Sequence, residues 1–272
     1  MPHVEAAGWR LSVLRQQPRM MIHRTKLLIW QYIQRGEAAL RINKFISETG
    51  YCSRREADKL VDGGRVTING VTALLGSQAE LGDDVRVDGR KIGKQRQHVY
   101  IALNKPVGIT STTELHIKGN IVDFIGHAER IFPIGRLDKD SEGLILLTND
   151  GDIVNPILRS EGKHEKEYLV TVDKPVTEAF LHGMASGVHI LGSMTLPCVV
   201  TRVTDRVFRI ILTEGRNRQI RRMCEAFGYH VRRLQRQRIM NIHLAGLQVG
   251  KWRDLTEAEK ATLFENLSYE PV

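Results

Sequence analysis

The sequence contains little of what builds a secreted or membrane protein. Its three cysteines, Cys52, Cys198 and Cys224, form no C-x-x-C pair, and their number is odd. This argues against a disulfide framework and against a metal site of the zinc type, and it predicts a reducing, cytoplasmic location. The longest apolar run near the N-terminus covers residues 27–30. That run is far too short to cross a bilayer, and it does not resemble a signal peptide.

Repeats and low-complexity segments are absent as well, and the prominent feature is an excess of positive charge. The 40 lysines and arginines outnumber the 31 acidic residues, which gives a formal net charge of +9 and a pI near 9.6. A hydrophobic fraction of 42% suffices for a folded core. The charge predicts a polyanionic partner, with nucleic acid as the first choice and an anionic membrane as the second.

The chain divides into three segments by composition and pattern. Residues 1–39 form a basic N-terminal extension without a continuous fold signal, although a short helix is predicted over residues 26–34. Two interpretations of this extension remain open: an arm that contacts RNA, or an addition that contributes little. Residues 40–95 form a small module, and a polar linker over residues 93–100 leads into a larger domain over residues 96–272.

The small module has clear local signals. Apolar residues at helical spacing predict a helix over residues 41–50, and Ser53 with Glu56 forms a capping box for a second helix. The dipeptides Asn69-Gly70 and Asp88-Gly89 each predict a β-hairpin. Two short helices and two hairpins therefore make up the module.

The larger domain mixes strands and helices without strict alternation. Strands are predicted over residues 100–105, 144–149, 165–173 and 206–213, and helices over residues 151–159, 177–185, 217–228 and 256–267. This order predicts an α+β fold on a mixed, largely antiparallel sheet with flanking helices.

A basic segment over residues 214–238 is the electrostatic centre of the chain. It carries Arg216, Arg218, Arg221, Arg222, Arg232, Arg233, Arg236 and Arg238. On a helical wheel the apolar stripe of its helix buries Ile220 and Met223, while Arg218 and Arg222 point away from the stripe. Arg221 lies at the border, where it either faces an internal carboxylate or is an ordinary surface arginine.

The acidic stretch over residues 135–152 allows three interpretations. A calcium loop of the EF-hand type requires a bidentate Glu at its twelfth position, which is Asn149 here. A glycosidase pair of Asp138 and Asp140 lacks an aromatic platform, because the three tryptophans lie far away in the sequence. The third interpretation is a single reactive aspartate compensated by an arginine. Asp150 and Asp152 are expected to favour the start of the next helix.

The small module resembles the S4-like RNA-binding domain over "RINKFISETGYCSRREADKLVDGGRVTING". The resemblance covers residues 40–95 and implies RNA rather than a membrane as the partner. It assigns RNA contacts to Lys44, Arg54, Arg55 and Arg65, and the basic helix adds Arg218 and Arg222.

The larger domain resembles the pseudouridine synthases of the RsuA/RluB/RluE/RluF family. The motifs "NKPVG", "GRLDKDSEGL", "KEYLV", "GRNRQIRRM" and "VRRLQR" follow one another in the family order, and "FPIGRLDKDS" and "HEKEYLVTVDKP" are similar to the RluF branch. The resemblance implies a catalytic Asp138, a Tyr168 that stacks on the target base, and an Arg221 that pairs with Asp138. It also implies three further residues of the substrate pocket: Lys105, Arg136 and Leu234. Of these, Lys105 is expected to serve either as scaffold or as a contact to the RNA backbone.

The activity implied by this resemblance is isomerisation of uridine to pseudouridine in RNA. The expected substrate is large-subunit (23S) ribosomal RNA, with the anticodon loop of tyrosine tRNA as a second one, and a monomer without cofactor or metal is expected. Asp138 either attacks C1′ or removes the 2′ proton, and the sequence leaves both routes open. The rival hypothesis is a non-catalytic RNA-binding or ribosome-assembly factor on the same fold.

Overall fold

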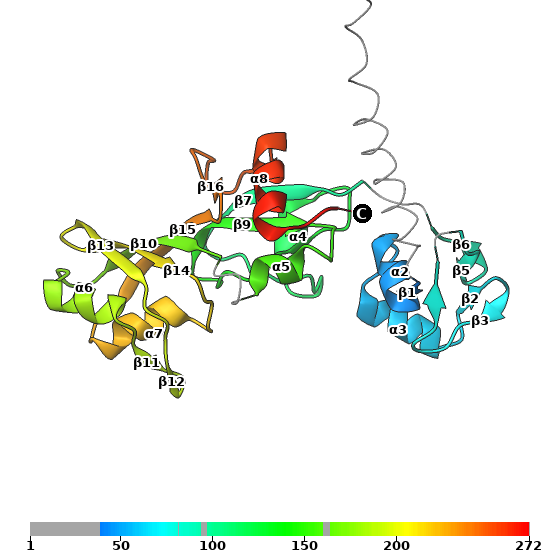
Figure 1. Ribbon diagram of the computed structural model, residues 1–272, viewed down its shortest axis with the longest axis horizontal. Coiled ribbons are helices and arrows are strands. Elements are labelled where there is room, and N and C mark those ends of the chain that lie inside the picture. Colours follow the sequence, from blue (N-terminus) through cyan, green and yellow to red (C-terminus); the bar gives the residue numbers. More distant parts are fainter. Residues whose placement is uncertain (1–38, 81, 94–96, 160–163, 272) are drawn as a thin grey trace, which may run out of the picture. The chain divides into compact units, whose positions relative to one another are not determined.

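The computed structural model describes residues 39–80, 82–93, 97–159 and 164–271 (Figure 1). The helix predicted over residues 26–34 lies outside them. The chain divides into two compact units; the first ends at Gly93, and the short stretch of residues 48–51 is grouped with the second. None of the helices in these ranges has the length and apolarity that a membrane span requires.

The helices of the first unit begin where the sequence predicts. They are α2 (Ile42–Glu48) and α3 (Arg54–Asp62). The Glu56 N–H donates to Ser53 Oγ at 3.2 Å, and the Ser53 N–H donates to Glu56 Oε2 at 2.7 Å. Both bonds of the capping box are therefore present, and they satisfy donors that the helix itself leaves unpaired.

The strands of the first unit form two small sheets. One pairs β1 (Leu40–Arg41) with β4 (Gln78–Ala79); the other has the order β3 (Val71–Thr72), β2 (Val66–Ile68), β5 (Val85–Val87), β6 (Arg90–Lys91). Asn69 and Gly70 have φ of 50° and 82°, and Asp88 and Gly89 have 49° and 76°. Positive φ at both central residues is the geometry of a two-residue hairpin turn, so both predicted hairpins are confirmed.

The second unit is built on one large sheet. Its strands are β7 (Tyr100–Lys105), β8 (Phe132–Pro133), β9 (Glu142–Thr148), β10 (Lys166–Val172), β13 (Val199–Thr204), β14 (Val207–Leu212), β15 (Val231–Ile239), β16 (Ile242–His243) and β17 (Trp252–Asp254). The order is β13-β14-β10-β15-β9-β7-β17, with β16 beside β15 and β8 beside β9. Among the described strands, only the β15–β9 pair is parallel. A separate hairpin joins β11 (His189–Ile190) to β12 (Ser193–Met194). The predicted mixed, largely antiparallel α+β fold is confirmed.

Helices cover different parts of the sheet. α6 (Glu178–Ala185) and α7 (Gln219–Ala226) pack on β10, β14 and β15 around Phe180, Phe208 and Met223. α5 (Val154–Leu158) and α8 (Glu257–Leu267) pack on the face of β9 that carries Leu144 and Leu146.

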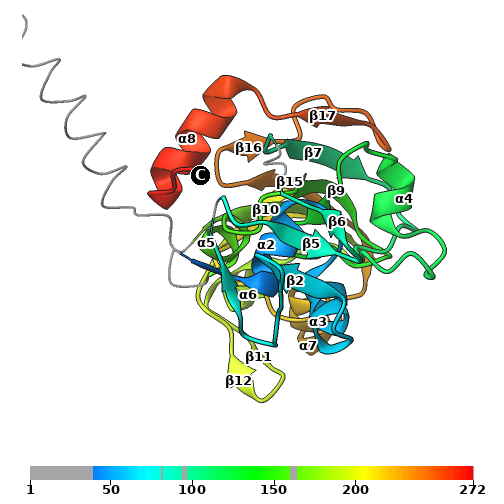
Figure 2. The ribbon, with the colours of Figure 1, turned by 90° about the vertical axis from the view of Figure 1, so that its right-hand side faces the viewer.

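The opposite face of β9 has its own helix. α4 (Ile121–Ile125) packs on the side chains of Ile145 and Leu147. Successive side chains of a strand point to opposite faces, so α4 and α8 lie on opposite sides of these strands (Figure 2). Tyr168 packs against both the α4 cluster and the α6–α7 cluster, which places it where the two covered halves meet.

Some elements differ from the predictions. The basic segment continues after α7 as strand β15. Its many arginines obscure the alternation of apolar and polar residues that indicates a strand, and only Leu234, Arg236 and Ile239 in it are buried. α5 has no side-chain cap from the preceding aspartates. Asp150 is instead buried and accepts hydrogen bonds from the hydroxyls of Tyr100 and Tyr269, both at 2.6 Å.

Candidate active site

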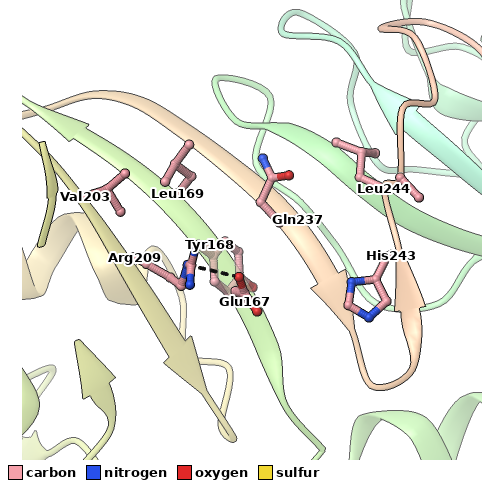
Figure 3. A pocket seen from close by; sticks show the side chains of 9 residues that line it. Glu167, Tyr168, Leu169, Val203, Arg209, Gln237, His243 and Leu244 are labelled. Carbon is pink, nitrogen blue, oxygen red and sulfur yellow. Dashed lines mark ion pairs between the residues drawn. The ribbon is translucent and has the colours of Figure 1, made fainter. Parts of the chain in front are cut away.

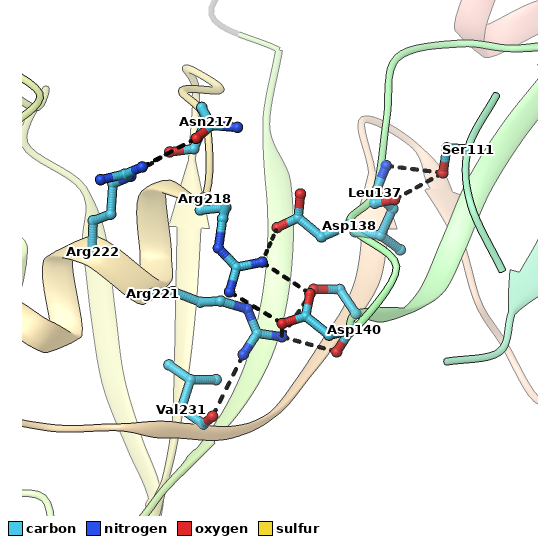
Figure 4. A network of polar contacts seen from close by, with 10 residues as sticks. Ser111, Leu137, Asp138, Asp140, Asn217, Arg218, Arg221, Arg222 and Val231 are labelled. Carbon is cyan, nitrogen blue, oxygen red and sulfur yellow. Dashed lines mark hydrogen bonds and ion pairs between the residues drawn. The ribbon is translucent and has the colours of Figure 1, made fainter. Parts of the chain in front are cut away.

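Asp138 lies in the loop that leads from β8 into β9. The Ser141 N–H donates to the Asp138 carbonyl at 3.0 Å, which closes a turn around the aspartate. The carboxylate remains 34% exposed, and Arg218 Nη1 lies 3.6 Å from its Oδ2 (Figure 4). Asp138 is therefore a carboxylate that water or a substrate reaches, with an opposite charge beside it.

Gly143, just after this loop, allows the backbone of β9 to approach the backbone of β15 closely. A Cβ at position 143 would lie 2.3 Å from the carbonyl oxygen and 2.6 Å from the nitrogen of Arg236, and the φ of Gly143 is 101°. Only glycine accepts both conditions. Arg236, directly opposite, is 5% exposed and donates from Nε to the Leu144 carbonyl at 2.6 Å. The Asp138 loop is thereby joined to β15, the strand that pairs with Tyr168.

Two arginines at the start of α7 hold the loop in different ways. Arg218, at the N-cap with a φ of 50°, donates to both carboxylate oxygens of Asp140 at 3.1 Å. Arg221, 8% exposed, donates from Nη2 to the Asp140 carbonyl at 2.9 Å and to Ser141 Oγ at 3.1 Å. Burial raises the pKa of Asp140, but the Arg218 hydrogen bonds and the Arg221 charge outweigh it, so the pKa lies below its ordinary value.

The expected pairing of Arg221 with Asp138 is not what the structure shows. Among the described residues, the carboxylate that pairs with Arg221 is that of Asp140, at 3.4 Å. The guanidinium that lies near the Asp138 carboxylate belongs to Arg218. The reason is the left-handed backbone at Arg218, which turns this side chain toward the loop before the helix begins. A helical wheel, which assumes helical geometry at residue 218, points it to solvent instead.

Tyr168 and Leu234 lie on the same face of the sheet. Tyr168 pairs with Arg236, and Val170, two residues further along β10, pairs with Leu234. The Tyr168 ring is partly buried, with the Arg236 guanidinium carbon 6.0 Å from its centroid. Leu234, at 6% exposed, belongs to the core under α6 and α7.

Lys105 serves as scaffold and offers RNA no surface. It is fully buried, and its Nζ donates to the carbonyls of Pro106 at 2.9 Å and Ile109 at 2.8 Å. Burial lowers the pKa of Lys105 to about 8, although the carboxylates of Asp140 and Asp138 oppose this. Of the two roles expected for Lys105, the arrangement agrees with the scaffold and not with an RNA contact, because the ammonium is already bonded to its own loop.

The remaining basic residues are mostly accessible. Arg136 is exposed, and within the described ranges no hydrogen bond or ion pair is recorded for it. Arg222 donates to the Asn217 carbonyl at 3.1 Å. In the first unit Arg54 and Arg55 are exposed, Lys44 on α2 is half-buried, and Arg65 pairs with Asp88 at 2.6 Å.

A separate pocket of about 510 Å³ opens on the other face of the sheet. Leu169, Arg209 and Gln237 line it, and Arg209 pairs there with Glu167 at 3.2 Å (Figure 3). Tyr168 also lines this pocket, whereas Asp138 does not. The described side chains also include no group of three histidines, cysteines or carboxylates placed to hold a metal ion.

Comparison with known proteins identifies both units. The family model described as RNA pseudouridylate synthase matches residues 99–226, and that of the S4 domain matches residues 40–85. The dual-specificity RNA pseudouridine synthase RluF of Escherichia coli (strain K12) is 57% identical over 231 residues, which cover 84% of this chain and 80% of that protein.

Two more distant matches are also described as pseudouridine synthases. The ribosomal large subunit pseudouridine synthase B of Bacillus subtilis (strain 168) is 34% identical over 229 residues, covering 80% of this chain and 93% of that protein. A solved structure described as a pseudouridylate synthase superposes with a TM-score of 0.62 at 31% identity, covering 83% of this chain and all of the other.

Proposed function

Because the chain belongs to the RsuA/RluF family of RNA pseudouridine synthases, we propose that Asp138 carries the uridine isomerisation that it catalyses. The observation that supports this assignment is the placement of Asp138. It is a partly exposed carboxylate with a guanidinium at 3.6 Å, held in a loop that two arginines and a glycine contact fix to the sheet. Asp140 and Glu142, by contrast, are occupied with arginines.

The reaction needs one ionised carboxylate and no atom from outside. The N1–C1′ bond breaks, the uracil turns, C5 bonds to C1′, and the proton displaced from C5 is balanced by one gained at N1. Asp138 begins the sequence either by attacking C1′ or by removing the 2′ proton. A partner cation reduces the cost of holding its charge in a partly dry site, and Arg218 supplies that cation.

The uridine reaches Asp138 only when it leaves its stack, at a cost of a few kcal/mol. Stacking on Tyr168 offsets about 1–3 kcal/mol of that cost. Arg136 has an exposed guanidinium to receive a phosphate. Leu234 supports the Tyr168 ring from the core below. Arg221 acts on Asp138 through the backbone at Asp140, and Lys105 acts through residues 106–109.

The substrate is large-subunit ribosomal RNA, with the anticodon loop of tyrosine tRNA as a second substrate. The words "ribosomal large subunit" in the name of one relative support the first substrate, and "dual-specificity" in the name of another supports the existence of a second one. The S4 unit contacts the RNA through Lys44, Arg54, Arg55 and Arg65, and α7 through Arg218 and Arg222. The enzyme acts in the cytoplasm as a monomer, without metal or cofactor.

Replacement of Asp138 by Asn tests the assignment. Pseudouridine formed in a ribosomal RNA fragment is quantified by carbodiimide labelling and primer extension, and affinity for the same fragment is measured by filter binding. We expect Asp138→Asn to form no product while its dissociation constant stays within about twofold of the wild-type value. Asp205→Asn, in an exposed turn, is the control and keeps full activity.

Three outcomes contradict the proposal. Product formation by Asp138→Asn at the wild-type rate removes the catalytic role. Wild-type protein that binds RNA but makes no pseudouridine favours the binding-factor hypothesis. Release of free uracil points to a glycosidase, since an isomerase releases nothing.

A further inference from the structure

The position of the Asp138 side chain depends on its backbone. In the described structure its one recorded side-chain contact is the ion pair with Arg218, at 3.6 Å, and the Arg218 side chain is itself 41% exposed. A single contact of that kind does not fix a carboxylate to the accuracy that catalysis needs, which is about 0.5 Å. The constraint has to come from the residues on either side.

One loop, residues 106–111, holds both neighbours of Asp138. On the N-terminal side, Ser111 Oγ donates to the Leu137 carbonyl at 2.8 Å and accepts from the Leu137 N–H at 3.3 Å (Figure 4). On the C-terminal side, the Gly108 N–H donates to the Lys139 carbonyl at 2.7 Å. Asp138 therefore sits between two peptide groups that the same loop holds.

This bracing loop is itself anchored at both ends. Lys105 Nζ binds the carbonyls of Pro106 and Ile109 inside the protein. At the other end, the Thr110 N–H donates to the Gly119 carbonyl at 2.9 Å, and the Ile121 N–H donates to the Thr110 carbonyl at 3.0 Å. Ile121 begins α4, so the loop is tied to the core on that face of the sheet.

We propose that Ser111 is a positioning residue for the reaction: its hydroxyl sets the place of Leu137 and, through it, of the Asp138 carboxylate. The proposal rests on Asp138 as the catalytic group. Ser111 is 8% exposed and Leu137 is 6% exposed, so water does not readily replace the hydroxyl. One hydroxyl satisfies both polar groups of Leu137, and its loss leaves a buried N–H and a buried carbonyl without partners.

The variant Ser111→Ala tests this, with Ser111→Thr as the conservative rescue. The measurements are the single-turnover rate at saturating enzyme, the dissociation constant for the RNA fragment, and the thermal midpoint. A displacement of about 1 Å at a reacting group lowers rates by about 100-fold. We expect Ser111→Ala to lose 10- to 100-fold in single-turnover rate with RNA affinity within twofold, and Ser111→Thr to regain most of the rate.

The matched control is Thr148→Val, at the far end of β9. Thr148 is fully buried, and its Oγ1 makes the same two kinds of bond: it donates to the Val99 carbonyl at 2.6 Å and accepts from the Asp150 N–H at 3.0 Å. Thr148→Val therefore removes an equivalent pair of buried bonds far along the strand from the loop. We expect it to lower the thermal midpoint as Ser111→Ala does, without the loss of rate.

The outcomes separate the proposal from the function on which it rests. Ser111→Ala at the wild-type rate, with Asp138→Asn inactive, overturns the positioning role alone. Equal rate losses in Ser111→Ala and Thr148→Val at equal loss of stability also overturn it, because they show a general effect of destabilisation. An active Asp138→Asn overturns the catalytic assignment instead.

Discussion

Gly143 offers the sharpest test of how the fold positions the loop. In Gly143→Ala the new Cβ would lie 2.3 Å from the Arg236 carbonyl oxygen and 2.6 Å from its nitrogen, where ordinary contacts begin near 3.4 Å. Strands β9 and β15 must then move apart by about 1 Å, and a forced backbone shift of this kind costs about 1–3 kcal/mol. A φ of 101° adds strain of about 1–3 kcal/mol for any residue with a side chain.

The two terms together predict a loss of roughly 2–6 kcal/mol in the free energy of unfolding. For a domain of this size each kcal/mol lowers the thermal midpoint by about 2–4 °C, so we expect a shift of roughly 4–24 °C. Urea unfolding followed by circular dichroism measures the free energy directly. We also expect the folded fraction to lose activity, because the moving strand carries the Asp138 loop.

Gly151→Ala is the matched control. A Cβ at Gly151 meets no atom within 4 Å, and its φ lies outside the left-handed region. The free energy of unfolding should therefore change by no more than about 1 kcal/mol. If Gly143→Ala unfolds at the same urea concentration as Gly151→Ala, the close approach of β9 and β15 does not require glycine at position 143.

Further predictions concern Tyr100 and Tyr269, the S4 unit and Arg221. Burial, together with the hydrogen bond to Asp150, raises the pKa of Tyr100 and of Tyr269 above the ordinary range. The unfolded chain releases these protons near pH 10. The contribution of both tyrosines to stability is therefore full below pH 10 and falls above it. Urea unfolding between pH 8 and 11 should show this fall in the wild type and a weaker one when both tyrosines are Phe. Arg55→Gln should reduce the slope of log affinity against log salt by about 1, and an unchanged slope would remove Arg55 from the RNA contacts. Arg221→Ala should lower turnover at least 100-fold because it releases the Asp140 carbonyl, and normal turnover would refute its role.

Much of the first unit was predictable because its signals are local. The capping box of Ser53 and Glu56 and the two hairpin dipeptides depend on residues within three positions of each other. Their geometry follows from nearby backbone donors and from the tolerance of Asn, Asp and Gly for positive φ. Distant residues have little influence on such features.

Strand β15 was not predictable in the same way. Six of its nine residues have charged or amide side chains, so the segment resembles a continuation of the basic helix. Its strand conformation follows from pairing with β10 and β9, whose residues lie far away in the sequence. Arg236 shows the consequence most clearly, because it is buried by a close contact with Gly143 that no local pattern indicates.

The sequence by itself determined the family and the order of most elements, since motifs and caps are read from residues near one another, and it is also the basis for proposing Asp138 among the carboxylates. The tertiary structure decided what each charged group contacts. Arg218 and Asp140 are 78 residues apart, yet they form the bidentate pair at the site, while Lys105 is buried in its own loop. An arginine or lysine side chain is long and can bind many partners, so which partner it binds is decided only when the sheet brings distant loops together.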